Sequence, residues 1–210
     1  MPDEFPAQLA QHVPAAALAY CVQLREEHPF CFRLSRSRRS KWGDYRYHLA
    51  HGRARHTITV NDDLNPHAFL ITYLHEVAHR ITFERHGFRI PPHGRQWQRC
   101  FRQLLLPVLN ASVFPADVQR ALADHARAPR ASAGADPVLT QTLRHYDPPS
   151  EAVCLSSVPV GAYFRFRSRR YVKQRVRRTR SLCQEVTTKK NYLILETTLV
   201  ERFHYVKLTP

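Results

Sequence analysis

The sequence predicts an α+β fold in two parts, a helical domain with a short antiparallel sheet and a smaller domain rich in β-strands. Three observations predict this class. Short runs with period-2 alternation follow an N-terminal helical segment, a long helical pattern begins near Asn65, and further strand patterns fill the last third of the chain. With 210 residues, 43% of them hydrophobic, the chain can bury a core in one domain or in two small ones.

The first segment of the chain is predicted to be helical and to be followed by three short strands. Residues 5–27 carry apolar residues at helical spacing, and Pro14 suits the first turn of a helix. The runs 30–34, 45–49 and 56–60 each alternate polar residues with aromatic or β-branched ones. We expect these three strands to pair in an antiparallel sheet.

A long helix is predicted over residues 65–86. Asn65 is a favourable N-cap before a proline, and Gly87 is suited to end the helix. Apolar residues recur on one face throughout this segment. Two further helices are expected after it, over residues 97–104 and 115–125.

Residues 127–137 have the composition of a linker. They are rich in alanine and proline and show no hydrophobic period. We therefore predict one domain over residues 1–126 and a second, β-rich domain over residues 138–210. In the second domain a short helix near residues 139–143 precedes strands at 162–167, 171–178, 192–195 and 202–208.

Composition excludes several classes of protein. No apolar run approaches the roughly 18 residues that a membrane-spanning helix needs. The five cysteines are scattered and form neither a disulfide framework nor a CxxC knuckle. The first residues show no basic region followed by an apolar stretch. We therefore expect a cytoplasmic protein without a membrane partner, and its formal net charge of +15 is compatible with association with the nucleoid.

Residues 75–79 read His-Glu-Val-Ala-His, an HExxH pattern inside the predicted long helix. His75 and His79 are four residues apart, so both imidazoles lie on one helix face and can reach one metal ion. Glu76 lies beside them and is placed to accept a proton from a reacting water. The pattern therefore predicts two zinc ligands and a general base, the alternative being two structural histidines without metal.

A catalytic zinc site needs a third protein ligand. His86 lies about 10 Å beyond His79 along a continuous helix, which is too far to share the ion. A metzincin would turn at a glycine three residues after the second histidine, where this chain has Thr82. His93 follows a proline-containing loop that can fold the chain back, so we predict His93 as the third ligand.

These residues carry a family resemblance. The HExxH pattern, followed by His93-Gly94 and then Trp97, resembles the SprT-like zinc metallopeptidase family, which includes the Spartan DNA–protein crosslink proteases. The similarity covers roughly residues 8–126. It implies a zincin-type domain, one Zn²⁺ held by His75, His79 and His93, Glu76 as general base, and protein substrates held on DNA. Many bacterial members end in a four-cysteine zinc ribbon, whereas the tail of this chain has only Cys154 and Cys183.

The positive charge is concentrated near the C-terminus, where residues 161–190 hold eleven Lys and Arg residues against one acidic residue, Glu185. The guanidinium forks of arginine suit phosphate oxygens, so this segment is suited to bind nucleic acid without strong sequence preference. The family resemblance implies DNA rather than RNA. The alternatives are a solubilising face or a surface for an acidic protein. The candidate nucleic-acid-binding residues are Arg165, Arg167, Arg169, Arg170, Lys173, Arg175, Arg177, Arg178 and Arg180.

Two functions follow from these patterns. The first is a zinc-dependent endopeptidase whose protein substrates are associated with nucleic acid. The second is a non-catalytic scaffold that binds nucleic acid and uses zinc only for stability. A purely structural zinc site is usually closed by a fourth Cys or His ligand, and the scattered cysteines offer no obvious one, although Cys100 or one of the remaining histidines could fold near the site. The sequence therefore favours the enzyme.

Overall fold

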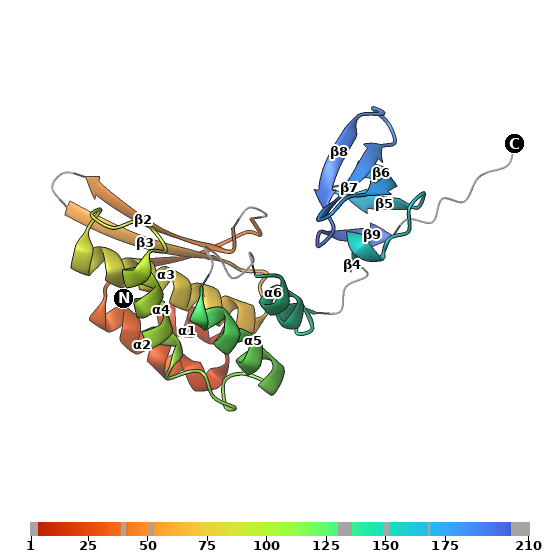
Figure 1. Ribbon diagram of the computed structural model, residues 1–210. Coiled ribbons are helices and arrows are strands. Elements are labelled where there is room, and N and C mark those ends of the chain that lie inside the picture. Colours follow the sequence, from red (N-terminus) through yellow and green to blue (C-terminus); the bar gives the residue numbers. More distant parts are fainter. Residues whose placement is uncertain are drawn as a thin grey trace, which may run out of the picture. The chain divides into compact units, whose positions relative to one another are not determined.

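The structure is a computed structural model that describes residues 4–38, 41–50, 53–129, 136–148, 152–167 and 169–202. The chain divides into two compact units, Met1–Asp147 and Pro148–Pro210. Figure 1 shows the helices and the sheet of the first unit and the separate sheet of the second. Each unit is therefore described by itself.

The first unit begins with helices and a three-stranded mixed sheet. Strand β3 lies in the centre, with β1 parallel to it on one side and β2 antiparallel on the other. The expected all-antiparallel sheet is therefore wrong for one of its two pairings. Strands β2 and β3 form a hairpin, so β2 occupies one side of β3 and β1 pairs with the other side. Residue alternation shows which side chains share a face but carries no information on whether β1 runs parallel or antiparallel to β3. The elements are α1 (Phe5–Ala10), η1 (Ala15–Ala17), α2 (Leu18–Glu27), β1 (Cys31–Ser35), β2 (Gly43–Ala50) and β3 (Arg53–Asn61).

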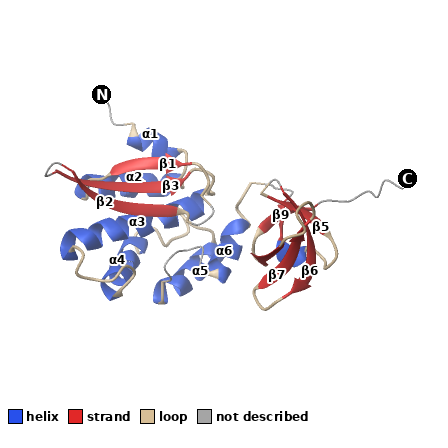
Figure 2. Ribbon diagram, turned by 90° about the horizontal axis from the view of Figure 1, so that it is seen from above, coloured by secondary structure: helices blue, strands red, loops and turns tan. Residues whose placement is uncertain are grey.

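Helix α3 (Pro66–His86) is the central element of the first unit and confirms the predicted long helix. Its N-cap is Asn65, whose side chain accepts a hydrogen bond from the Ala68 N–H at 2.9 Å. It ends at Gly87, which has a positive φ of 59°. Figures 1 and 2 show α3 along one face of the sheet, with α4 on the other side of the helix. This sandwiched position explains why most α3 side chains are buried.

Helices α4 (Arg95–Leu105), α5 (Ala116–Arg127) and α6 (Pro137–Arg144) complete the first unit. Leu139 and Leu143 of α6 are buried in the same core as the side chains of α3, α4 and α5. The Asn65 amide also donates to the Leu143 carbonyl at 2.8 Å. The units divide after Asp147 rather than within residues 127–137, so our assignment of this helix to the second domain is corrected. Most of the predicted linker lies outside the described residues.

The second unit is a six-stranded antiparallel half-barrel within the described residues, with strand order β4-β9-β5-β6-β7-β8. Its small core contains Phe164, Tyr171, Cys183, Ile194 and Val200. Most of the predicted strand 202–208 lies outside the described residues. The elements are β4 (Ala152–Cys154), η3 (Leu155–Ser157), β5 (Tyr163–Phe166), β6 (Arg169–Val176), β7 (Arg180–Glu185), β8 (Asn191–Leu195) and β9 (Leu199–Arg202).

Candidate metal centre

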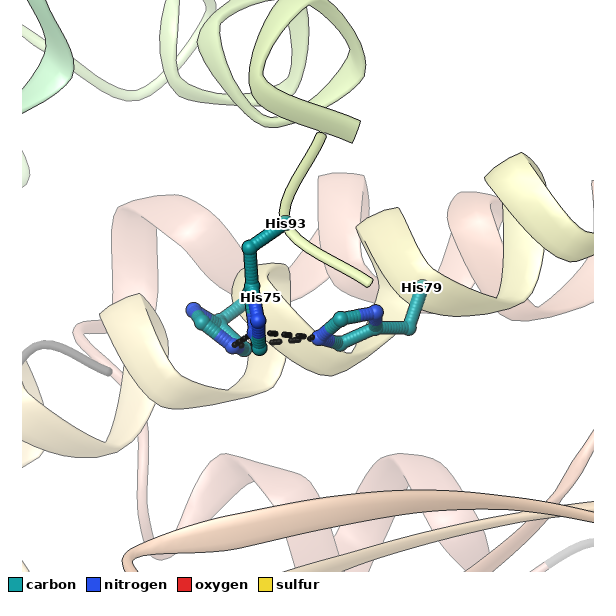
Figure 3. A group of neighbouring side chains, drawn as sticks. All are labelled: His75, His79 and His93. Carbon is teal, nitrogen blue, oxygen red and sulfur yellow. Dashed lines mark hydrogen bonds between the residues drawn. The ribbon is translucent and has the colours of Figure 1, made fainter. Parts of the chain in front are cut away.

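Three histidine side chains converge at one point, as Figure 3 shows. The Nε2 atom of His79 is 3.3 Å from that of His75 and 2.9 Å from that of His93. The Nε2 atoms of His75 and His93 are 3.2 Å apart. The structure therefore brings together all three sequence-predicted ligand residues, two from α3 and one from the segment before α4.

This arrangement fits a metal ion better than it fits hydrogen bonds. A neutral imidazole presents one N–H and one lone pair, so three Nε2 atoms facing one another cannot all be paired. A tetrahedral zinc ion with Zn–N bonds of about 2.0–2.1 Å places its nitrogen ligands about 3.3–3.4 Å apart, close to the separations seen here. Among the described residues the group that can hold a metal is His75, His79 and His93, with no fourth side chain. Such a three-histidine site leaves a position open.

The backbone around His93 is unusual. His93 has a φ of 61°, in the left-handed region that favours glycine and asparagine. The following Gly94 is extended and caps α4, and its N–H donates to the Pro91 carbonyl at 3.1 Å. A left-handed, non-glycine residue typically costs on the order of 1–3 kcal/mol and is concentrated at functional sites. This conformation turns the imidazole back toward α3.

Burial keeps the three imidazoles uncharged. It lowers the pKa of His79 to about 3, and the neighbouring His93 lowers it further in the same direction. It also holds the pKa of His75 well below its ordinary value and lowers that of His93. Neutral imidazole is the form that binds a metal, so the lone pairs are available at neutral pH.

Glu76 lies next to the triad and is buried. Burial raises the pKa of this carboxyl to about 8, and the nearby Asp44 raises it further. The backbone N–H of Tyr45 donates a hydrogen bond to the carboxylate, which lowers the pKa of Glu76. A buried carboxyl group that is oriented by a fixed donor beside a metal site is positioned to exchange a proton with a water there.

Strand β2 approaches Glu76 at a glycine. A Cβ atom added to Gly43 would lie 2.7 Å from Thr72 Cγ2 and 2.8 Å from Glu76 Oε1. Only glycine therefore lets this strand lie close enough for the Tyr45 N–H to reach the carboxylate. No sequence motif points to Gly43 or Asp44 as part of the site. Their role depends on the contact between β2 and α3, which leaves no signal within either segment.

The triad lies in an open cleft of about 510 Å³. His75, Glu76 and His79 line it together with aromatic and apolar residues. Phe88 stands at the cleft with 80% of its surface exposed. The Trp97 ring packs against the imidazoles, with its centroid 5.2 Å from that of His79, and is 1% exposed. The apolar wall consists of Tyr45, Tyr47, Phe83, Phe88, Ile90, Pro91, Pro92 and Trp97.

The predicted nucleic-acid-binding residues belong to the second unit, and most of them are exposed. Lys173 is the exception and its prediction is corrected, because it is 2% exposed. Its ammonium group donates to the Leu155 carbonyl at 2.8 Å and lies 3.2 Å from the Glu196 carboxylate. Lys173 lies on the strand face that carries Tyr171, so it supports the core. The exposed ones are Arg165, Arg167, Arg169, Arg170, Arg175, Arg177, Arg178 and Arg180.

Some of the exposed arginines have carboxylate partners. Arg165 contacts Glu201 at 2.6 Å, and Arg169 lies 3.5 Å from Glu185. The Arg165–Glu201 pair lies at the surface and contributes little to stability, whereas the Glu185 carboxylate is buried. The remaining positive charge still dominates this part of the unit.

Comparison with known proteins gives no match to a protein-family model, a curated protein or a solved structure. Across the described residues, no helix has the length and apolar character to cross a membrane.

Proposed function

We propose that this protein is a zinc-dependent endopeptidase of the SprT-like type, acting on protein substrates that are associated with nucleic acid. The observation that carries the proposal is the convergence of three imidazole Nε2 atoms within 3.3 Å, beside a buried carboxyl group in an open cleft. A purely structural zinc site would have its fourth position closed by protein. Zinc is favoured because neutral imidazole ligands suit it and, among the described residues, no carboxylate joins the group.

Different residues of this chain would hold the metal ion, transfer the proton and orient the general base during peptide hydrolysis. When bound, the zinc ion supplies Lewis acidity that activates water and polarises the peptide carbonyl. His75, His79 and His93 hold that ion. Glu76 accepts the proton of the attacking water and returns it to the leaving amine, and the Tyr45 N–H fixes the orientation of the carboxylate. The apolar wall of the cleft accommodates apolar side chains of the substrate.

The resemblance to Spartan-related proteases and the basic second unit support nucleic acid as the setting of the substrate. In this proposal the second unit holds DNA and the first cleaves protein bound to the same DNA. The test uses the full chain, its zinc content, and cleavage of a DNA-bound protein with and without single-stranded DNA. Glu76→Gln keeps the shape of the side chain and removes the base, so zinc should be retained and cleavage lost.

A second substitution separates metal binding from catalysis. His79→Ala should lower both zinc content and cleavage. Undiminished cleavage by Glu76→Gln would remove Glu76 from the mechanism. Bound zinc with no cleavage under any condition would favour the non-catalytic, zinc-stabilised nucleic-acid scaffold instead.

A further inference from the structure

The second unit contains a pocket of about 660 Å³. It is lined by residues of β5, β6, β7 and β8, together with Thr198. The proposed peptidase does not use this pocket, and the half-barrel places aromatic rings and guanidinium groups around it. Its lining residues include Phe166, Arg167, Arg169, Tyr171, Arg180 and Tyr192.

The aromatic part of the pocket is a set of three rings. Tyr171 is buried at its base, with its ring centroid 6.2 Å from that of Phe166 and 5.7 Å from that of Tyr192. The Tyr171 and Tyr192 rings are perpendicular, with an interplanar angle of 89°. Phe166 and Tyr192 are only partly buried. The partly exposed Tyr192 ring is therefore accessible to a planar ligand at the pocket, and base stacking on an aromatic ring is tolerant of sequence.

The charged part of the pocket consists of Arg167, Arg169 and Arg180, all exposed. The Arg167 guanidinium lies over the Phe166 ring at 5.2 Å from its centroid. Glu185 is the single acidic residue of segment 161–190, and it lies beside Arg169. Three guanidinium groups disfavour a cationic ligand, although an aromatic cage alone would accept one. They favour phosphate next to the rings.

The backbone at Arg167 supports a role for its side chain. Phe166 pairs with Arg169 across the β5–β6 hairpin, so Arg167 is in the tight turn. Its φ is 52°, in the left-handed region where hairpin turns favour glycine or asparagine. An arginine there is less stable than glycine by an amount on the order of 1 kcal/mol. The guanidinium group of this conformationally disfavoured residue lies at the pocket.

We propose that this pocket binds single-stranded nucleic acid, with one base against Tyr192 and the flanking phosphates against the arginines. The proposal deepens the nucleic-acid half of the proposed function and is independent of the zinc site. A duplex keeps its base faces stacked and cannot offer them to the rings. An acidic peptide would satisfy the arginines but leave the ring faces without a planar partner.

The experiment measures binding of fluorescein-labelled dT12 to the full-length protein by anisotropy at several salt concentrations. Tyr192→Leu keeps an apolar side chain and removes the ring, and it should weaken binding about five- to hundredfold. Arg167→Gln should weaken binding and make the salt dependence shallower. Lys190→Gln is the control, because Lys190 is exposed in the second unit, does not line the pocket and is not among the candidate nucleic-acid-binding residues. It removes the same charge and should change affinity less than twofold.

Two further measurements separate binding in the pocket from general attraction to positive charge and from loss of the fold. Arg167→Gly removes the guanidinium group and relieves the backbone strain of the turn. It should therefore weaken dT12 binding without lowering the melting temperature, which distinguishes a lost ligand contact from unfolding. Unlabelled duplex DNA and polyglutamate should compete poorly with dT12. Equal losses in the Arg167→Gln and Lys190→Gln variants, equal competition by either polyanion, or no binding of dT12 would overturn the proposal. Zinc content and cleavage are measured separately. If the protein shows no peptidase activity but binds dT12 at this pocket, the proposed function fails while the pocket proposal is supported.

Discussion

Replacing Gly43 by alanine should disturb the proposed general base without touching a metal ligand. The new Cβ would lie 2.7 Å from Thr72 Cγ2, 2.8 Å from Glu76 Oε1 and 2.9 Å from Glu76 Cγ. These separations are well inside the usual contact distance between carbon atoms of about 3.5–4.0 Å, so β2 or the Glu76 side chain must move. Overpacking of this kind costs roughly 1–3 kcal/mol of stability. A displacement of about 1 Å at a catalytic group can lower activity about a hundredfold.

The assay compares kcat/KM, zinc content and melting temperature for Gly43→Ala and a control. Gly161→Ala is a suitable control, since Gly161 has a φ of 85° and nothing lies within 4 Å of an added Cβ. It should lose stability through backbone strain while keeping activity and zinc. Adding Thr72→Ser to Gly43→Ala removes the closest clash and should recover stability more than activity, because the contacts with Glu76 persist. Full activity in Gly43→Ala would refute the close approach of β2 to Glu76.

Three other substitutions test the remaining features. His93→Gly should abolish zinc binding while raising the stability of the metal-free protein by about 1 kcal/mol, measured by denaturation, because glycine relieves the left-handed backbone; a less stable variant would contradict this. Lys173→Ala should destabilise the second unit by about 2–4 kcal/mol, seen as a lower unfolding midpoint, by leaving Glu196 without its buried partner; an unchanged midpoint would argue against that pairing. Burial alone would raise the pKa of Asp44, but hydrogen bonds from Arg38 and Lys41 hold it below its ordinary value. Its stabilising effect is therefore present above the unfolded-state pKa of 3.8 and lost as pH falls through the lower folded pKa, so Asp44→Asn should lower the melting temperature at pH 7 with a deficit that shrinks in acid.

Features with local causes were predictable from the sequence. The limits of α3 follow from the Asn65 cap and from Gly87, and the spacing of His75 and His79 places both rings on one face. His93 was predicted from the requirement for a third ligand and from the loop before it. The structure brings its Nε2 atom within 3.2 Å of the other two.

Features that depend on long-range packing were not predictable. Alternation along β1 shows which residues share a face but not the direction of the strand, so the parallel pairing with β3 was missed. Strand β7 was missed because its inward face carries Ser181, Cys183 and Glu185, which do not resemble a core pattern. Lys173 belongs to a basic run and resembles a surface residue, and its burial is explained by two partners distant in the chain, Glu196 and the Leu155 carbonyl.

The position of His93 has a consequence for the shape of the cleft. Phe83, Phe88, Ile90, Pro91 and Pro92 all lie between His79 and His93 in the chain, and all line the cleft wall. An ion bound by both histidines closes this segment into a ring of covalent and coordinate bonds, which reduces the freedom of the chain as any loop closure does. In the proposed enzyme, metal binding and substrate selection would thereby be coupled, because the ligand that completes the metal site also anchors one end of the surface proposed to select the peptide. Chelation of the ion would then loosen the wall of the cleft as well as stop the chemistry.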